Sequence, residues 1–336
     1  MKAAFFKYPG EVEVREVEKP TARGSEVVVR VLACGICGSD IALFDRGRSD
    51  WQRAGHEYAG IVEQVGPEVS TVKVGDAVTG IGSVPCGACP NCLSGRPRYC
   101  HAPQPFGGGA FAEFVCHDER FCQQASGLSA EVASLVEPLT VAMELVEDGR
   151  VGLGSVVLLV GAGPIGLMAL RLCVLAGAEK VYVAHTSTEN ARARLAREWG
   201  ATEVLPSGEG LAGALREREP QGADVVLITC PPSRVLSQAI AAATHGATIA
   251  FVGVEWQDTT ALEIPLDRFH FAKQALVGSN HNPCRRMYPL GVALLRSKRV
   301  DGERLITHRF PLAEIAAGMR TVQERKDEVI KAVVVP

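Results

Sequence analysis

The sequence predicts an α/β protein in which a β-rich region is joined to a doubly wound parallel sheet. Short β-branched runs between Gly and Pro residues fill roughly the first 120 positions, a pattern typical of β structure. From about residue 127, apolar strand patterns alternate with helical patterns, as they do in βαβ units. The 336 residues are enough for two domains that each bury a core.

The expected elements follow in chain order. In the β-rich region they are strands at residues 27–32, 59–65, 77–79 and 111–116. In the α/β region we expect strands at 155–160, 180–184, 224–229 and 247–252, with helices at 164–176, 191–199 and 234–244. A strand after residue 273, a helix near 290–297 and a strand at 331–335 complete the chain.

Composition and charge exclude several classes of protein. The chain is 47% hydrophobic and 22% charged, as ordinary globular proteins are. Its net charge of −3 argues against nucleic acid or an anionic membrane as a partner, because both bind basic surfaces. No apolar run reaches the roughly 18 residues of a membrane-spanning helix. The N-terminal segment turns polar too early for a secretory signal, so we expect a cytoplasmic protein.

Eleven cysteines are many for a reducing compartment, where disulfides are unusual. Clustered cysteines there indicate metal ligands. Cys86, Cys89, Cys92 and Cys100 are spaced so that four thiolates can close around one tetrahedral Zn²⁺, with no position left for a substrate. The spacing therefore predicts a structural zinc in a lobe at about residues 84–102.

A dinucleotide-binding turn is predicted where GAGPIG follows an apolar strand and opens a helix. The first glycine permits a tight turn, the second lets the backbone approach a pyrophosphate, and the third allows close helix–strand packing. The helix N-terminus attracts the phosphates. The residues expected to contact the dinucleotide here are Gly161, Gly163, Pro164, Ile165 and Gly166.

The end of the next strand bears on the choice between NAD and NADP. An acidic residue usually stands there and bonds the ribose 2′-hydroxyl of NAD, but this chain has His185. His185, Thr186 and Ser187 can all donate to a 2′-phosphate, and no carboxylate precedes Glu189 to repel it. The sequence therefore favours NADP over NAD.

A second metal site is predicted from dispersed residues. Cys37 lies in CGICGSD, His56 and Glu57 lie in GHE, and Glu137 lies in EPL. Each alone has an ordinary structural explanation. Beside a dinucleotide turn, however, a Cys, a His and a carboxylate can give Zn²⁺ three protein ligands and one open position. Such a zinc polarises an alcohol or carbonyl oxygen during hydride transfer, and Ser39 can take the alcohol proton.

Together these motifs resemble the zinc-containing medium-chain dehydrogenase/reductase family, within it the polyol (sorbitol-type) and threonine dehydrogenase branch. The likeness covers essentially the whole chain. It rests on CGICGSD, GHE, GIVEQVG, VGDAV, the four-cysteine lobe, EPL, GAGPIG and THRFPL in this order.

The resemblance implies a fold, an assembly and roles for the site residues. It implies a GroES-like β-barrel catalytic domain made of residues 1–126 and 274–336, and a Rossmann domain made of residues 127–273. It also implies a homodimer or homotetramer and two zinc ions per chain. Cys37 and His56 would ligate the catalytic zinc, with Glu57 or Glu137, or both, as carboxylate ligands. Glu137 is typical of polyol-type members, whereas relatives acting on simple alcohols tend to have Cys there.

Departures from the family pattern bear on the substrate. Many relatives carry a proton-relaying His where this chain has Ala42, and the stretch from Cys37 to His56 is shorter than usual. Sorbitol-type enzymes have an Arg–Tyr pair where this chain reads SNHNPCRRMY, so sorbitol itself is not the expected substrate. The polar candidates in that stretch, for which a surface loop is an equal explanation, are His281, Asn282, Arg285 and Arg286.

The resulting hypothesis is a zinc-dependent oxidoreductase that moves a hydride between NAD(P) and a secondary alcohol of a polyol, sugar or cyclitol. One alternative is an amino-alcohol dehydrogenase of the threonine type, whose substrate ammonium group would need an acidic partner. Another is a non-catalytic zinc and nucleotide binder, which would have no need of an open metal site.

Overall fold

A computed structural model of the chain describes residues 1–46, 49–255, 261, 264–280 and 285–336. The chain forms two compact units. The first comprises Met1–Thr140 and Asn282–Pro336, and the second comprises Val141–His281. Among the described residues no helix is long and apolar enough to cross a membrane.

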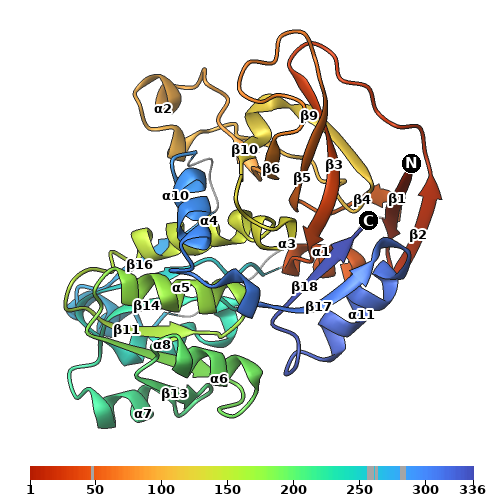
Figure 1. Cartoon of the computed structure of the whole chain (residues 1–336). Helices are drawn as coiled ribbons and strands as arrows, with labels where there is room; N and C mark the ends of the chain where they lie inside the picture. Colours follow the sequence, from red (N-terminus) through yellow and green to blue (C-terminus); the bar gives the residue numbers. More distant parts are fainter. Residues whose placement is uncertain (47–48, 256–260, 262–263, 281–284) are drawn as a thin grey trace. The chain divides into compact units, whose positions relative to one another are not determined.

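The first unit is built mainly of β-strands (Figure 1). Its largest sheet has the order β10-β6-β5-β3-β18-β17, with β9 also paired to β3, and a smaller sheet has the order β2-β1-β4. The strands are β1 (Lys2–Lys7), β2 (Glu11–Glu16), β3 (Glu26–Gly35), β4 (Gln52–Arg53), β5 (Glu57–Val65), β6 (Ala77–Gly80), β7 (Ser83–Val84), β8 (Gln104–Pro105), β9 (Phe114–Asp118), β10 (Cys122–Gln124), β17 (Ile306–Pro311) and β18 (Lys331–Val335). The helices are α1 (Gly38–Arg46), α2 (Pro90–Leu93), α3 (Ala130–Ala133), the start of α4 (Val136–Asp148), α10 (Met287–Arg296) and α11 (Ile315–Glu324).

The two ends of the chain meet in this sheet. β3 is a ten-residue strand whose β-branched side chains are almost all buried, so it can have neighbours on both sides. It pairs with β5 along most of its length, and with β18 at Cys34 and Gly35. β18 therefore lies beside the end of β3, which leads into Cys37.

The second unit contains a six-stranded, fully parallel sheet of order β13-β12-β11-β14-β15-β16. This is the strand order of a doubly wound dinucleotide-binding fold. The strands are β11 (Val156–Val160), β12 (Lys180–His185), β13 (Glu203–Pro206), β14 (Ala223–Ile228), β15 (Ala243–Phe251) and β16 (Ala275–Gly278), and the helices are α5 (Pro164–Leu175), α6 (Ala191–Glu198), α7 (Leu211–Arg218), α8 (Leu236–Ala242) and α9 (Leu266–Phe271).

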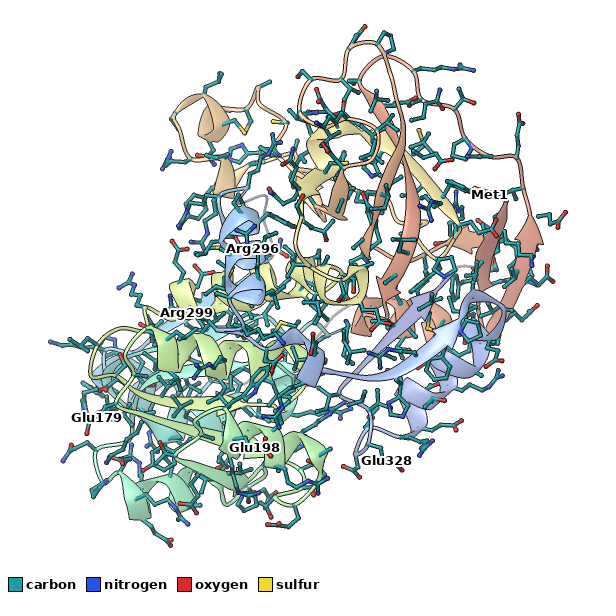
Figure 2. The ribbon with its side chains drawn as sticks, viewed as in Figure 1. Met1, Glu179, Glu198, Arg296, Arg299 and Glu328 are labelled. Carbon is teal, nitrogen blue, oxygen red and sulfur yellow. The ribbon has the colours of Figure 1, made fainter. Side chains whose placement is uncertain are left out.

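The core of the second unit explains why its strands are so apolar. β11 reads VVLLV and is buried over its last four residues, because helices cover both faces of a parallel sheet. Side chains of α7 and α8 pack with those of β11, β12, β14 and β15 in one cluster. Charged side chains such as Glu179 and Glu198 lie on the surface (Figure 2).

The structure confirms the predicted fold class and corrects several local predictions. The β-rich region also contains α1, which was missed because it is short and carries only a few apolar residues, among them Ile41 and Phe44. The strand expected at 111–116 begins at Phe114 instead. Strand β17 and helix α11 were also missed.

The boundaries between the two units differ from the domain boundaries predicted from the sequence. The sequence placed the changes of domain after residues 126 and 273, whereas the units divide after Thr140 and before Asn282. At the first division, α3 packs against β3, β5 and β6 of the first unit. At the second, β16 is hydrogen bonded to β15 and so belongs to the parallel sheet.

Candidate functional site

The structure brings three of the predicted catalytic metal ligands together in the first unit. One ligand atom each of Cys37, His56 and Glu57 lies within 4.8 Å of the others. Cys37 stands between the end of β3 and the start of α1, while His56 and Glu57 lie at the start of β5. The pairing of β3 with β5 holds the two segments in register, with Gly35 opposite Glu57.

Asp40, in the first turn of α1, orients this cluster. Its carboxylate accepts hydrogen bonds from the backbone N–H of Cys37 at 2.9 Å and of Gly55 at 3.2 Å, and it lies 3.8 Å from His56 Nδ1. Burial alone would lower the pKa of His56, but the charge of Asp40 and the contact with Cys37 raise it well above its usual value. Asp40 therefore holds the backbone next to two ligands and faces the ring of one of them.

Glu57 has a cationic partner from the other end of the chain. Lys331 Nζ pairs with Glu57 Oε2 and donates to the carbonyl oxygen of Ile36 at 2.9 Å. Glu57 is 1% exposed and Lys331 is 3% exposed, so each charge needs the other. Gly35 leaves room for the pair, since a Cβ there would lie 2.2 Å from Glu57 Oε2.

Glu137 and Ser39 lie outside the three-residue cluster. Glu137 is in the first turn of α4 and is 5% exposed. Its charge contributes to the raised pKa of His56. Ser39 is half-buried in α1, two residues after Cys37. A thiol, an imidazole and nearby carboxylates are a donor set that Zn²⁺ accepts, with a coordination position left for substrate.

The four cysteines of the lobe have the geometry of a closed metal site. The sulfur–sulfur distances are 3.4 Å for Cys86–Cys100, 3.9 Å for Cys89–Cys100 and 4.0 Å for Cys86–Cys92. With zinc–sulfur bonds of about 2.3 Å, the edge of a tetrahedron is about 3.8 Å. The sulfur atoms therefore fit Zn²⁺ without rearrangement.

The lobe has little else to hold it together. Its large apolar side chains point outward, with Leu93 75% exposed and Tyr99 58% exposed. Backbone N–H groups of His101 and Cys92 lower the pKa of Cys89 to about 6, whereas burial raises that of Cys92 to about 12. A bound divalent cation favours the thiolate form of all four cysteines.

The predicted dinucleotide turn lies at the carboxyl end of β11 in the second unit. Gly161 has φ +106°, and α5 begins at Pro164 with Gly163 as its N-cap. A Cβ on Gly166 would lie 2.0 Å from the carbonyl oxygen of Gly161, whereas a Cβ on Gly163 would meet nothing within 4 Å. Helix and strand thus need Gly166 for their contact, and the space above Gly163 is open to a ligand. Ile165 is half-buried in the first turn.

His185 ends β12 and is 8% exposed. The side chain of Asn190 caps α6 with its Oδ1 and has its Nδ2 3.1 Å from His185 Nε2. Thr186 is exposed and Ser187 is half-buried. The next acidic residue along the chain, Glu189, is exposed.

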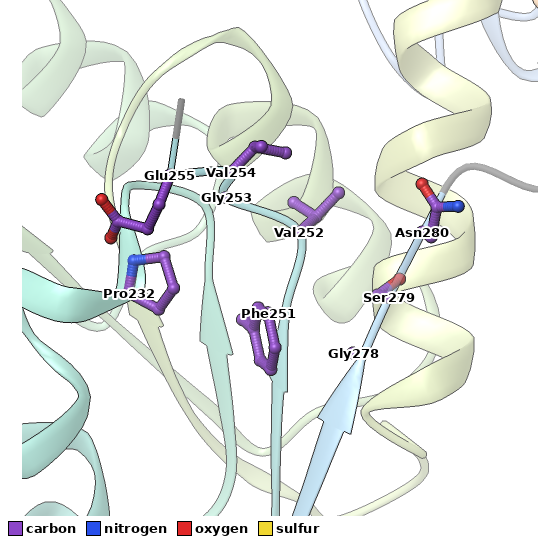
Figure 3. Close-up of a pocket in the computed structure, with 9 residues that line it drawn as sticks. All are labelled: Pro232, Phe251, Val252, Gly253, Val254, Glu255, Gly278, Ser279 and Asn280. Carbon is purple, nitrogen blue, oxygen red and sulfur yellow. The ribbon is translucent and has the colours of Figure 1, made fainter. Parts of the chain in front are cut away.

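A cavity of about 400 Å³ lies at the carboxyl ends of the neighbouring strands of the second unit (Figure 3). Among the described residues, Ser279 Oγ is buried there without a hydrogen-bond partner. The carboxylate of Glu255 accepts a hydrogen bond from the backbone N–H of Ser233 at 2.9 Å. The lining residues are Pro232, Phe251, Val252, Gly253, Val254, Glu255, Gly278, Ser279 and Asn280.

Two of the four polar candidates for the substrate pocket, His281 and Asn282, lie outside the described residues. Arg285 and Arg286 are exposed at the start of α10. The sequence reasoning missed Asp40, Lys331 and Ser279. Asp40 stands within CGICGSD and could have been found, since a carboxylate so near a metal ligand commonly orients it. Lys331 lies in an apolar strand, and nothing local marks it as a partner of Glu57.

Comparison with known families covers most of the chain. A family model described as alcohol dehydrogenase GroES-like domain matches residues 23–127, and one described as zinc-binding dehydrogenase matches residues 164–297.

Individual relatives extend the match over almost the full length. The sorbitol dehydrogenase of Bacillus subtilis is 30% identical, with 100% of this chain and 97% of the relative covered. The L-threonine 3-dehydrogenase of Marinomonas is 30% identical over 91% of this chain and 92% of its own. A crystal structure of an Escherichia coli oxidoreductase/dehydrogenase of unknown specificity has a TM-score of 0.91 at 28% identity, covering 99% of this chain and 98% of that one.

Proposed function

The chain belongs to the zinc-containing medium-chain dehydrogenase family, in its polyol and threonine branch, and from this we propose that it is an NAD(P)-dependent oxidoreductase of polyhydroxylated alcohols. The observation that carries the proposal is the cluster of Cys37, His56 and Glu57, because three protein donors leave a tetrahedral metal one position for a substrate. A closed structural site and a dinucleotide turn accompany it.

Two ligands of the catalytic metal are Cys37 and His56, and the third is a carboxylate. The Glu57 carboxylate lies within the cluster but is paired with Lys331, and the Glu137 carboxylate contributes to the raised pKa of His56, so both are candidates for the third ligand. Zn²⁺ held there supplies a Lewis acid for the substrate oxygen, which no side chain of the site provides. Asp40 fixes the backbone at Cys37 and Gly55, and Ser39 receives the proton of the alcohol.

The dinucleotide is bound by the second unit. Its pyrophosphate lies at the N-terminus of α5 over Gly163, where the backbone leaves open space. The cavity at the carboxyl ends of β14, β15 and β16 receives the nicotinamide, which is the hydride carrier. The hydroxyl of Ser279, which has no hydrogen-bond partner within the described part of the chain, is available there to a polar group of the coenzyme.

The preferred coenzyme is NADP, because the acid that would bind a ribose 2′-hydroxyl is absent and would otherwise repel a phosphate. His185 and Thr186 stand in its place. The test is kcat/KM with both coenzymes. The unmodified enzyme should prefer NADP⁺, and His185→Asp should shift the ratio of the two values toward NAD⁺ by roughly 10-fold or more. A wild-type preference for NAD⁺ would contradict the assignment.

The substrate is a polyol, sugar or cyclitol rather than an amino alcohol. An amino alcohol brings an ammonium group that needs an acidic partner. Of the carboxylates at the metal cluster, Asp40 accepts hydrogen bonds from the backbone N–H groups of Cys37 and Gly55, and Glu57 is paired with Lys331. A panel of polyols, sugars, cyclitols and amino alcohols, followed by coenzyme absorbance, distinguishes these classes.

The catalytic assignment is tested by Cys37→Ser, with Cys116→Ser as a control that changes a half-buried cysteine outside both metal sites. Cys37→Ser should lower kcat by more than about 100-fold and leave dinucleotide affinity nearly unchanged, because the coenzyme is held by the other unit. Wild-type protein should contain about two zinc ions per chain. Unchanged turnover in Cys37→Ser would refute the assignment, whereas a wild-type protein that turns over no alcohol would favour a non-catalytic binder.

A homodimer is the proposed assembly, with the edge of the parallel sheet as its interface. Among the described strands β16 pairs only with β15, and helix α9, which precedes β16 in the chain, exposes Leu266 by 70% and Phe271 by 74%. An open strand edge beside exposed apolar side chains is the kind of surface that a second copy covers by extending the sheet.

A further inference from the structure

Arg53 is a cation close to the catalytic cluster for which the proposed chemistry gives no role. It ends the short strand β4, which pairs with β1 through Arg53 and Phe5 (Figure 1). Three residues later comes His56, so the Cα atoms of Arg53 and His56 are at most about 10 Å apart. The segment between them is fixed by Ala54 and Gly55, which bond Phe111 and Asp40.

The guanidinium of Arg53 lies against a glycine segment. Its Nη2 donates to the carbonyl oxygen of Gly109 at 2.6 Å. A Cβ on Gly109 would lie 3.3 Å from the guanidinium carbon and from Nε, so the absence of a side chain makes room for the cation. Arg53 Nε is buried and has no acceptor among the described residues.

Arg53 differs from two other arginines of the same unit, because no described carboxylate lies beside it. Arg309 pairs with Glu131 at 2.6 Å, and Arg120 pairs with Asp118 at 2.9 Å. The described residues place no carboxylate within ion-pair distance of Arg53, and burial lowers its pKa. A partly buried cation without a counter-charge is unfavourable, and an anion from outside the chain would supply that counter-charge.

We propose that Arg53 binds an anionic group, a phosphate or a carboxylate, on the substrate that is oxidised at the Cys37–His56 site. The inference rests on the proposed function. A planar guanidinium binds either oxyanion through two parallel hydrogen bonds, and Arg53 offers more donors than Gly109 occupies. One end of the substrate is then fixed by its charge, and a hydroxyl a few carbons away lies at the metal.

The first test measures anion binding without turnover. Inorganic phosphate and malonate are titrated calorimetrically into the zinc-loaded protein and three variants. Arg53→Met should weaken binding roughly 10- to 100-fold, because a charge-assisted hydrogen bond is lost. Arg53→Lys keeps the charge without the planar fork and should weaken it less. Arg15→Met, which removes an arginine on β2 that already pairs with Glu13, should leave affinity unchanged. Equal binding by wild type and Arg53→Met would overturn the proposal.

The second test compares turnover of a neutral polyol, its phosphate monoester and the corresponding sugar acid. Wild-type enzyme should show a higher kcat/KM for one of the anionic compounds, which identifies the anion. That preference over the neutral polyol should fall roughly 10-fold or more in Arg53→Met. Turnover of the neutral polyol with no anionic preference would refute the role of Arg53 and leave the proposed function intact. Arg53-dependent phosphate binding with no turnover of any compound would refute the function instead.

Discussion

At the residue scale, His117 is a histidine that the fold keeps neutral. It is 8% exposed in the first unit, its Nδ1 donates to the carbonyl oxygen of Asp118 at 3.0 Å, and Tyr58 is bonded to its Nε2. Burial lowers the pKa of His117 to about 4. A positively charged imidazolium there would be buried away from water, so the folded chain favours the neutral form of the His117 ring.

This depressed pKa predicts a pH dependence of stability. In the unfolded chain, His117 takes up a proton below its ordinary pKa near 6.5. In the folded chain the same side chain stays neutral down to about pH 4. The free energy of unfolding should therefore fall by about 3 kcal/mol between roughly pH 6.5 and pH 4 from this group alone. Urea unfolding at several pH values measures the loss.

Two histidine variants isolate that contribution. His117→Gln should flatten the pH dependence between roughly pH 6.5 and pH 4, whereas His245→Gln changes an exposed histidine and should keep the wild-type slope. Identical slopes in all three proteins would show that His117 is not the titrating group.

The candidate metal ligands show which individual residues of the site could be predicted from the sequence. The four lobe cysteines and the Cys37, His56 and Glu57 set were predicted because metal ligands recur at short spacings or in short motifs. Their geometry supports the prediction. Lys331 was not foreseen, because a lysine in an apolar strand gains its role only when the chain returns beside Glu57.

At the scale of elements, two glycines of the turn between β11 and α5 have different roles. Gly166 is needed for packing, whereas Gly163 leaves space for the dinucleotide. Gly166→Ala places a methyl group against the backbone at Gly161 and should destabilise the fold by about 3 kcal/mol. Gly163→Ala meets no atom and should change stability by less than about 1 kcal/mol. It should nevertheless weaken dinucleotide binding roughly 10-fold or more, because the methyl group occupies the space above the helix N-terminus. Denaturant unfolding and calorimetric titration separate the two effects, and equal dinucleotide affinity in wild type and Gly163→Ala would contradict the assignment.

The four-cysteine lobe should depend on its metal. Cys89→Ser removes one of four thiolates, so bound zinc should fall from about two to about one per chain. Without an apolar core the lobe should then open, and trypsin should cut after Arg98 much faster than in wild type. Mass spectrometry of the fragments and metal analysis measure both. Cys116→Ser should retain both zinc ions, and an uncut lobe in Cys89→Ser would show that other contacts hold it.

Some helices and strands were predicted from the sequence more accurately than others. In the second unit the elements that were expected lie close to their predicted positions, because each carries an unbroken apolar run or a helical period, whereas β13, α7 and α9 were not predicted. α1 and α11 were missed for different reasons. α1 is short and sits among β patterns, whereas α11 was passed over although Ile315 and Met319 are buried at helical spacing.

At the scale of the whole molecule, the open edge of the parallel sheet predicts the assembly. Phe271→Glu should convert a dimer to a monomer, because a charge would be buried at the proposed interface. Leu153→Glu changes a residue that is 94% exposed elsewhere in the same unit and should leave the dimer intact. Light scattering after size-exclusion chromatography gives the mass. A wild-type monomer, or a dimer that survives Phe271→Glu, would exclude this interface.

The sequence by itself determined the fold class and the family, and it predicted the two metal ligand sets and the dinucleotide turn. Each depends on residues close together in the chain or on periodic burial, and such patterns are visible before folding. The tertiary structure decided which charges are neutralised. Lys331 reaches Glu57 only because β18 pairs with β3, and the fold sets Arg53 against the carbonyl of Gly109 with no described carboxylate beside it. The balance between desolvation and pairing depends on neighbours from distant segments, and only the folded chain brings those together.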